Sequence, residues 1–123
     1  MLLPLFDKNC DHVGWIKPGN HIFNTDMAWV AYLVKDHAWS AHTGNWLGPV
    51  NDLFCCQDRI GRVLAWNPEG NVADSAVPVN PKRAARTTRP AHPTRLGNPT
   101  RPVRPETPVG GWSPQSFLAW IEQ

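Results

Sequence analysis

Hydrophobic, small and aromatic residues recur at a fixed interval of 17 positions between residues 4 and 71, and no gap is needed to align the four copies. One aligned column is apolar throughout, the next holds only small residues, and the third is aromatic in three copies of four. A period kept over four copies is typical of a structural repeat. The columns are Val13, Val30, Leu47 and Leu64; Gly14, Ala31, Gly48 and Ala65; and Trp15, Tyr32, Pro49 and Trp66.

A unit of this length matches one β-hairpin with its two turns. In the first copy, residues 5 and 6 begin a strand, residues 7–11 are turn-like, residues 12–16 form the return strand, and residues 17–20 turn into the next copy. One turn column favours side chains that bond their own backbone, and another suits a positive φ where glycine stands. These columns are Asp7, Asn24, Ala41 and Asp58, and Cys10, Met27, Gly44 and Gly61.

Four hairpins give eight antiparallel strands, and we therefore predict an all-β fold. A lone hairpin is barely stable in water, so the copies must pair, and closing the sheet removes its two exposed edges. The expected object is a small barrel with pseudo-four-fold symmetry over residues 1–75. An open eight-stranded sheet or a sandwich is the alternative.

The third copy departs most from the pattern, because Ser40, Ala41 and Pro49 stand where the first copy has Phe6, Asp7 and Trp15. The third hairpin is accordingly expected to be shorter than the others, or open.

The return strand is apolar on both faces, since simple alternation points Val13 and Trp15 one way and Gly14 and Ile16 the other. Either long hairpins cover each other with the aromatic column, or a ligand or a tail segment fills an apolar channel in which the small column leaves room. The candidate binding residues at the channel or rim are Gly14, Trp15, Ala31, Tyr32, Gly48, Ala65 and Trp66.

Composition changes near residue 75. Residues 76–123 hold nine of the thirteen prolines, and seven basic side chains against two acidic ones, whereas residues 1–75 hold five basic and eight acidic side chains. Proline recurs too often between residues 77 and 108 for a helix or a central strand. We expect an extended, polyproline-like linker over residues 76–108.

Three functions are open for this basic linker. Its cations would be drawn to an anionic membrane or to nucleic acid, although the acidic head repels nucleic acid and disfavours that partner. Residues 99–104, Pro-Thr-Arg-Pro-Val-Arg, fit a proline-rich ligand for a protein partner. The third interpretation is a solubilising spacer that folds back on the acidic residues 1–75. Candidate contacts in the linker are Arg95, Arg101 and Arg104.

Residues 109–123 read as a short amphipathic helix. Ser113 is the expected cap with Pro114 at the first helical position, and Trp112 is placed to pack on Phe117. Phe117, Trp120 and Ile121 share one face. So short a helix is unstable alone, so we expect it to dock on the barrel or in its mouth, or else on a partner or a membrane surface.

The repeat also limits the chemistry. His12, His21, His37 and His42 fall in four different columns, so no symmetric histidine ring is expected. Three cysteines make a disulfide framework improbable, and neither a metal site nor a nucleophile motif is recognisable. We predict no enzyme, no cofactor, no metal and no catalytic residue. Without a leader or a long apolar run, the expected location is cytoplasmic, with peripheral membrane association left open.

Three stretches carry a resemblance to a known family. The repeats Leu-Phe-Asp-Lys-Asn-Cys-Asp-His-Val-Gly-Trp-Ile and Cys-Gln-Asp-Arg-Ile-Gly-Arg-Val-Leu-Ala-Trp, the Arg/Pro-rich stretch, and the closing Gly-Gly-Trp-Ser-Pro-Gln-Ser-Phe-Leu resemble the bacterial four-fold β-flower family. The resemblance implies a shallow symmetric barrel of hairpin petals around a largely apolar channel. It also implies a shape similar to the tubby carboxy-terminal domain, which binds phosphoinositide-containing membranes. It supplies no biochemical function.

The sequence thus favours a non-catalytic binding module that holds a hydrophobic group or a lipid at an apolar channel or aromatic rim. The alternative is a protein-interaction adaptor that recruits its partner through the Pro/Arg-rich tail and the terminal helix. Trp112, Phe117 and Trp120 are the candidate contacts in that helix segment.

Overall fold

The computed structural model describes residues 2–50, 55–70 and 81–123, the last range without residues 82, 83, 86, 95, 104, 106, 109 and 110. The predicted contacts Arg95 and Arg104 therefore lie outside the described residues.

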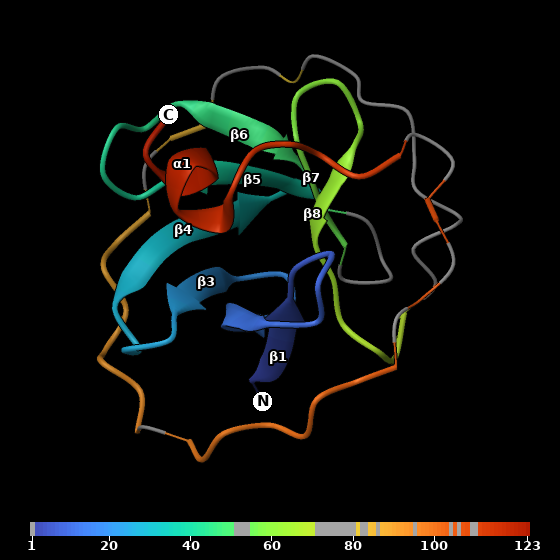
Figure 1. The fold of residues 1–123 in the computed structure, drawn as a ribbon. Coiled ribbons are helices and arrows are strands. Elements are labelled where there is room, and N and C mark those ends of the chain that lie inside the picture. Colours follow the sequence, from blue (N-terminus) through green and yellow to red (C-terminus); the bar gives the residue numbers. More distant parts are fainter. Residues whose placement is uncertain are drawn as a thin grey trace.

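The described residues form eight strands and one helix, and the all-β prediction with a short terminal helix is confirmed (Figure 1). The second strands of successive hairpins begin at His12, Trp29, Trp46 and Val63, each 17 residues after the one before. The elements are β1 (Leu3–Phe6), β2 (His12–Lys17), β3 (His21–Asn24), β4 (Trp29–Val34), β5 (His37–Ser40), β6 (Trp46–Pro49), β7 (Cys56–Gln57), β8 (Val63–Ala65) and α1 (Phe117–Ile121).

All strand pairs are antiparallel. Six strands form one sheet in the order β1-β2-β3-β4-β5-β6, and β7 pairs with β8. Two isolated bridges connect these sheets: Val50 pairs with Cys56 after β6, and Phe6 at the end of β1 pairs with Trp66 after β8. The latter bridge has two backbone hydrogen bonds, from Phe6 N to Trp66 O at 2.8 Å and from Trp66 N to Phe6 O at 2.9 Å.

The four turns within the hairpins share one backbone feature. The residue expected to favour a positive φ has one in every copy: Cys10 at 64°, Met27 at 62°, Gly44 at 75° and Gly61 at 99°. In three copies the side chain at the start of the turn accepts hydrogen bonds from two backbone N–H groups further on; these side chains are Asp7, Asn24 and Asp58. The polar columns therefore build the turns as predicted.

The third hairpin bears out one of the two expected departures. It is not open, since His37, Ala38 and Trp39 pair with Pro49, Gly48 and Trp46. Its return strand β6 is shorter, with four residues where β2 and β4 have six each. Ala41 has no side-chain oxygen, and Ser40, one position earlier, accepts from the N–H groups of residues 42 and 43 instead. Starting the turn one residue earlier preserves the motif, and the fourth hairpin is the shortest of those described.

Each hairpin contains a β-bulge, and the bulge explains why the return strands are apolar at adjacent positions. In the first hairpin Leu5 pairs with Gly14 and Phe6 pairs with His12, so Val13 is the extra residue. Both Val13 and its neighbour pack toward the main core, which contradicts the simple alternation expected from the sequence. The extra residues of the four bulges are Val13, Val30, Leu47 and Leu64, the apolar column of the repeat.

The main core lies on one face of the strands and includes the helix. It joins Leu5, Ile16 and Ile22 to the buried side chains of α1, which are Phe117, Trp120 and Ile121. Figure 1 shows α1 surrounded by strands, with the described part of the linker passing around their outside. Two smaller apolar clusters are separate from this core, one around Phe6 and Trp66 and one around Trp15 and Phe23.

Candidate functional site

The four hairpin turns surround the terminal segment, residues 111–123, and we call this end of the molecule the mouth. The turns are numbered one to four and comprise residues 7–11, 24–28, 40–45 and 58–62. The segment is hydrogen-bonded to turns three and four, while a cavity separates it from turns one and two.

Turn three and the strand after it hold the end of α1 through three hydrogen bonds. Trp120 Nε1 donates to Leu47 O at 2.9 Å, Ser40 Oγ donates to Ile121 O at 2.7 Å, and Asn45 Nδ2 donates to Gln123 O at 2.7 Å. Trp120 is fully buried. The helix therefore docks on its own chain, as one of the sequence alternatives expected.

The start of the helix was predicted wrongly. The N-cap is Ser116, whose Oγ accepts from Ala119 N at 3.1 Å, and α1 begins at Phe117. Trp112 packs in the cluster around Phe6 and Trp66 and pairs with Val63 in a parallel bridge, whereas Phe117 belongs to the main core. The expected Trp112–Phe117 staple is thus replaced by two separate anchors.

Ser113, the expected cap, serves turn four instead. Its hydroxyl donates to Asp58 Oδ2 at 2.8 Å, and its backbone N donates to Val63 O at 2.9 Å. Burial acts to raise the pKa of Asp58, but hydrogen bonds from Arg62, Ser113 and Ile60 and the charge of Arg62 together hold that pKa below its ordinary value. Asp58 therefore binds the terminal segment as a carboxylate.

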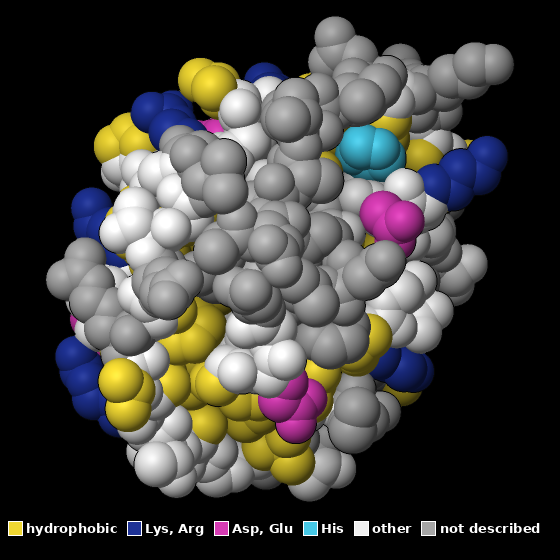
Figure 2. Space-filling view, turned by 90° about the vertical axis from the view of Figure 1, so that its right-hand side faces the viewer, with side chains coloured by type: hydrophobic (Ala, Val, Ile, Leu, Met, Phe, Trp, Pro, Cys, Tyr) yellow, Lys and Arg dark blue, Asp and Glu magenta, His cyan; other side chains and the backbone are white. Residues whose placement is uncertain are grey.

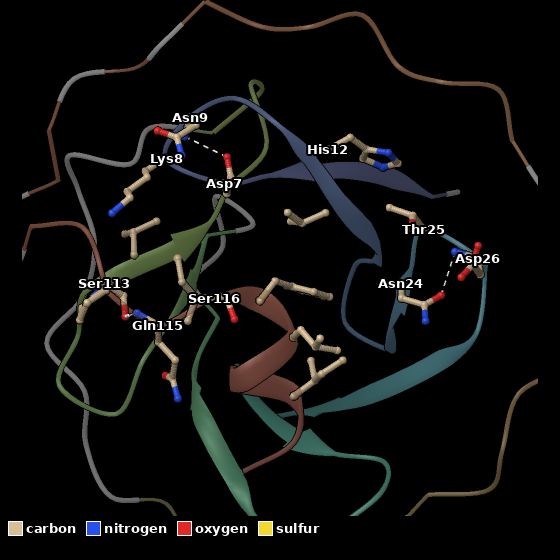
Figure 3. A pocket seen from close by; sticks show the side chains of 17 residues that line it. Asp7, Lys8, Asn9, His12, Asn24, Thr25, Asp26, Ser113, Gln115 and Ser116 are labelled. Carbon is tan, nitrogen blue, oxygen red and sulfur yellow. Dashed lines mark hydrogen bonds between the residues drawn. The ribbon is translucent and has the colours of Figure 1, made fainter.

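A cavity of about 580 Å³ lies at the mouth between turns one and two, β8 and the terminal segment. Its polar lining residues come mostly from the turns and from residues 113–116, and Figure 3 shows them around a central group of apolar side chains. The apolar lining residues are Val13, Val63, Leu64, Pro114, Phe117, Leu118 and Ile121. Leu118 on α1 is 62% exposed, which makes this wall accessible from solvent.

The polar rim carries charges of both signs. Asp7, Asp26 and Lys8 line the cavity together with His12. His12 Nε2 donates to Gly14 O at 2.9 Å, and burial lowers the pKa of this imidazole despite that bond. His12 is therefore neutral at pH 7, and the rim has one more acid than base. An apolar floor under a polar rim suits an amphiphilic ligand.

The small column allows close approach of its neighbours, and at Gly14 this neighbour is α1. A Cβ added to Gly14 would lie 3.0 Å from Cζ of Phe117 and 2.6 Å from the carbonyl oxygen of Phe23. A Cβ on Gly48 would collide with the carbonyl oxygen of Gln57. Ala31 and Ala65 are fully buried in the same core as α1. The terminal segment thus occupies the space that the sequence offered either to a ligand or to the tail.

The aromatic column lies elsewhere. Trp15 packs with Phe23 and Met27, Trp66 packs with Phe6 and Cys10 and donates from Nε1 to Asp7 O at 2.7 Å, and Tyr32 contacts Trp29. All three column members are at most 5% exposed. None of the seven predicted channel or rim residues lines the mouth cavity, and a direct ligand contact by any of them stays a prediction.

Sequence reasoning missed the residues that do line the cavity. His12, Asn24 and Thr25 were assigned to strands and turns with no ligand role, and only Phe117 among the predicted contacts reaches the cavity. The usable signal was the apolar column, since Val13 and Leu64 from two of its copies form part of the floor.

The linker touches turn one. Arg101 Nη1 lies 3.0 Å from Asp11 Oδ1, and its Nη2 donates to Asn9 O at 2.6 Å. Both charged side chains are more than half exposed, so the ion pair itself contributes little stability. Through these two contacts of Arg101, the basic tail folds back on the acidic first part of the chain.

Figure 2 shows one face of the molecule. Basic side chains lie toward its edges, and hydrophobic side chains gather at its lower end.

The described residues contain no cluster of three or more metal-ligating side chains. Cys10, Cys55 and Cys56 are buried and form no disulfide, and burial strongly raises the pKa of Cys56, with Cys55 adding to the effect. Among the described residues no helix is long and apolar enough to cross a membrane.

Comparison with known proteins identifies the family. No curated protein and no solved structure gives a significant match to the chain. A family model described as "4-fold beta flower protein" matches residues 3–121, which include all eight strands and α1. The chain therefore belongs to the 4-fold beta flower protein family.

Proposed function

We propose that this protein is a non-catalytic binding module that holds a hydrophobic group or a lipid chain at its mouth. The observation that carries the proposal is the cavity of about 580 Å³, with its apolar floor and polar rim. A volume of several hundred Å³ is typical of small-molecule sites, and a lining that is apolar below and polar above suits an amphiphile.

The scaffold for this site is a closed barrel of four 17-residue repeats. Three observations support it. The second strands of the four hairpins begin at intervals of 17 residues, Val50 bridges to Cys56, and Phe6 bridges to Trp66. The two bridges join the six-stranded sheet to the β7–β8 pair at both of its edges, as a closed barrel requires. Residues 76–108 are the linker that returns the chain to the mouth, and the described residues from 81 to 108 have no helix or strand.

The interior of the proposed barrel is filled by α1, whose buried side chains belong to the main core. Because α1 fills the space beside the small column, the ligand lies next to α1 rather than along a central channel. Its hydrophobic part contacts Val13, Leu64 and Leu118, and its polar end faces the rim. This arrangement fits a cytoplasmic protein that meets lipids at a membrane surface.

A neutral detergent monomer tests the proposal. Full-length ¹⁵N-labelled protein is titrated with decyl maltoside below its micellar concentration, and the amides of Val13, Leu64 and Leu118 are expected to shift. The Leu118→Gln variant removes an apolar wall that is already solvent-exposed, and it should weaken binding roughly fivefold, as loss of one partly buried aliphatic contact would.

Val103→Gln is the matched control, because Val103 is 90% exposed and does not line the cavity. It should bind decyl maltoside like the unchanged protein. Absence of shifts at the cavity amides, or equal weakening by the two variants, would contradict the proposal.

A second candidate is the adaptor function of the tail. Val103, next to Pro102, is almost fully exposed, and the described residues around it form no regular structure, so a partner has access to this segment. Purified SH3 domains should then bind the full-length protein and lose binding when Pro99 and Pro102 are replaced by Ala. Equal binding by the double variant would remove this candidate.

A further inference from the structure

A second cavity lies on the other side of the terminal segment. It has a volume of about 530 Å³, and it shares Pro114 and Gln115 with the mouth cavity. Turn four supplies most of its remaining wall. The lining residues are Asp58, Arg59, Ile60, Arg62, Pro114, Gln115 and Gln123.

Two guanidinium groups of this cavity are held in place through their Nε atoms. Arg59 Nε donates to Trp46 O at 2.8 Å, and Arg62 Nε donates to Asp58 Oδ2 at 3.0 Å. Within the described part of the chain, the Nη atoms of these two residues make no hydrogen bond. A guanidinium oriented in this way presents its remaining N–H donors to a ligand.

The acid in this cavity is already occupied. Asp58 Oδ1 accepts from Ile60 N and Arg62 N, and Asp58 Oδ2 accepts from Ser113 Oγ and Arg62 Nε. Four donors saturate the carboxylate, so it offers a ligand no free acceptor. With two arginines and one compensated acid, the side chains that line the cavity have a net positive charge and unused donors.

The edge of the cavity is apolar. Ile60 at the tip of turn four is 71% exposed, and Pro114 is exposed beside it in the same lining. A large aliphatic side chain between two arginines gives an anionic head and its first carbons adjacent contacts.

We propose that this second cavity binds a phosphate monoester group carried on an aliphatic chain. Arg59 and Arg62 contact the phosphate oxygens through their Nη atoms, and Ile60 and Pro114 contact the chain. The site is separate from the mouth cavity of the proposed function and recognises charge, whereas the mouth cavity needs only a hydrophobic group. No bond is made or broken.

The test uses full-length ¹⁵N-labelled protein titrated with monomeric decyl phosphate at low ionic strength. Amides of Arg59, Ile60 and Arg62, which line this cavity and not the mouth cavity, are expected to shift. Arg59→Gln should weaken binding about tenfold, because a charge-assisted hydrogen bond is lost, and added salt should weaken it further. Arg59→Lys keeps the charge but loses the planar fork, and should give an intermediate affinity.

Arg89→Gln is the control for net charge, since Arg89 is an exposed arginine outside both cavities. It should bind decyl phosphate within about twofold of the unchanged protein. An unchanged amide spectrum away from turn four shows that each variant is folded. No shift at the turn-four amides, or equal weakening by Arg59→Gln and Arg89→Gln, overturns the proposal.

Inorganic phosphate distinguishes a free anion from a lipid head. Weaker binding of inorganic phosphate than of decyl phosphate supports the aliphatic contact with Ile60, whereas equal binding overturns that part. Decyl maltoside reports on the mouth cavity alone, so either site can fail without the other.

Discussion

At the scale of single residues, the β-bulges explain the apolar column of the repeat. Val13, Val30, Leu47 and Leu64 are the extra residues that let two successive side chains turn toward one core. A small residue follows each of them directly, and the neighbour that limits its size differs between copies: Phe117 of α1 and the Phe23 carbonyl at Gly14, and the backbone of Gln57 and Asp58 at Gly48. The first repeat therefore provides one side chain to fill the core and one gap for the helix.

Gly14 tests this division of roles. Gly14→Val should lower the free energy of unfolding by about 2 to 3 kcal/mol, because the added carbons meet the Phe23 carbonyl and the Phe117 ring. Urea denaturation followed by Trp fluorescence measures the change. Gly97→Val is the control, since nothing lies within 4 Å of a Cβ there and its φ is not positive. A similar effect of the two changes would mean that Gly14 does not limit the space for α1.

The residue scale also shows what the sequence could predict. The turns could be predicted because their determinants are local. The side chains of Asp7 and Asn24 bond backbone N–H groups two residues further on, and Cys10 and Met27 have the positive φ that the turn requires. The bulges could not be predicted, because a pair of adjacent apolar residues fits two cases equally well. The two side chains can point to opposite faces of a regular strand, or to the same face at a bulge. The cavity was missed because its lining combines turns one and two and β8 with residues 113–121, which are far from these turns in the sequence.

At the scale of elements, α1 depends on its surroundings. A helix of five residues is too short to persist alone in water, and it is held here by Ser116 at its start and by Leu47, Ser40 and Asn45 at its end. Its apolar face was predictable from spacing. Its first residue was not, because Ser113 satisfies Asp58 rather than the helix N-terminus.

Trp120 is the anchor of this element. Trp120→Ala should cost about 3 to 5 kcal/mol of unfolding free energy, since a fully buried indole is removed and the Leu47 carbonyl loses its donor. Thermal and urea denaturation of the full-length variant measure the loss. Leu118→Ala on the exposed side of the same helix should stay within about 0.5 kcal/mol. Equal stability of the Trp120 variant and the unchanged protein would show that α1 is a loosely attached end.

At the scale of the whole molecule, the question is whether the strands close into a ring. An open sheet would leave β1 with a free edge, and free edges fray and exchange their amide protons quickly. Here Phe6 and Trp66 donate to each other's carbonyls across the remaining gap, so neither β1 nor β8 has a free end at this position. The terminal segment is hydrogen-bonded both to turn three, through Ile121, and to turn four, through Ser113, and so connects these two turns.

Closure predicts that the amides of Phe6 and Trp66 are protected from hydrogen exchange as strongly as those inside the six-stranded sheet. Exchange followed by NMR should be slower than at Lys8, in the exposed first turn, by at least about 10³-fold, which corresponds to about 4 kcal/mol of opening free energy. Trp120→Ala should reduce this protection only as far as it reduces global stability, because the bridge does not involve α1. If Phe6 and Trp66 exchange as fast as Lys8 in the unchanged protein, the strands form an open sheet, and the mouth is a groove along its end.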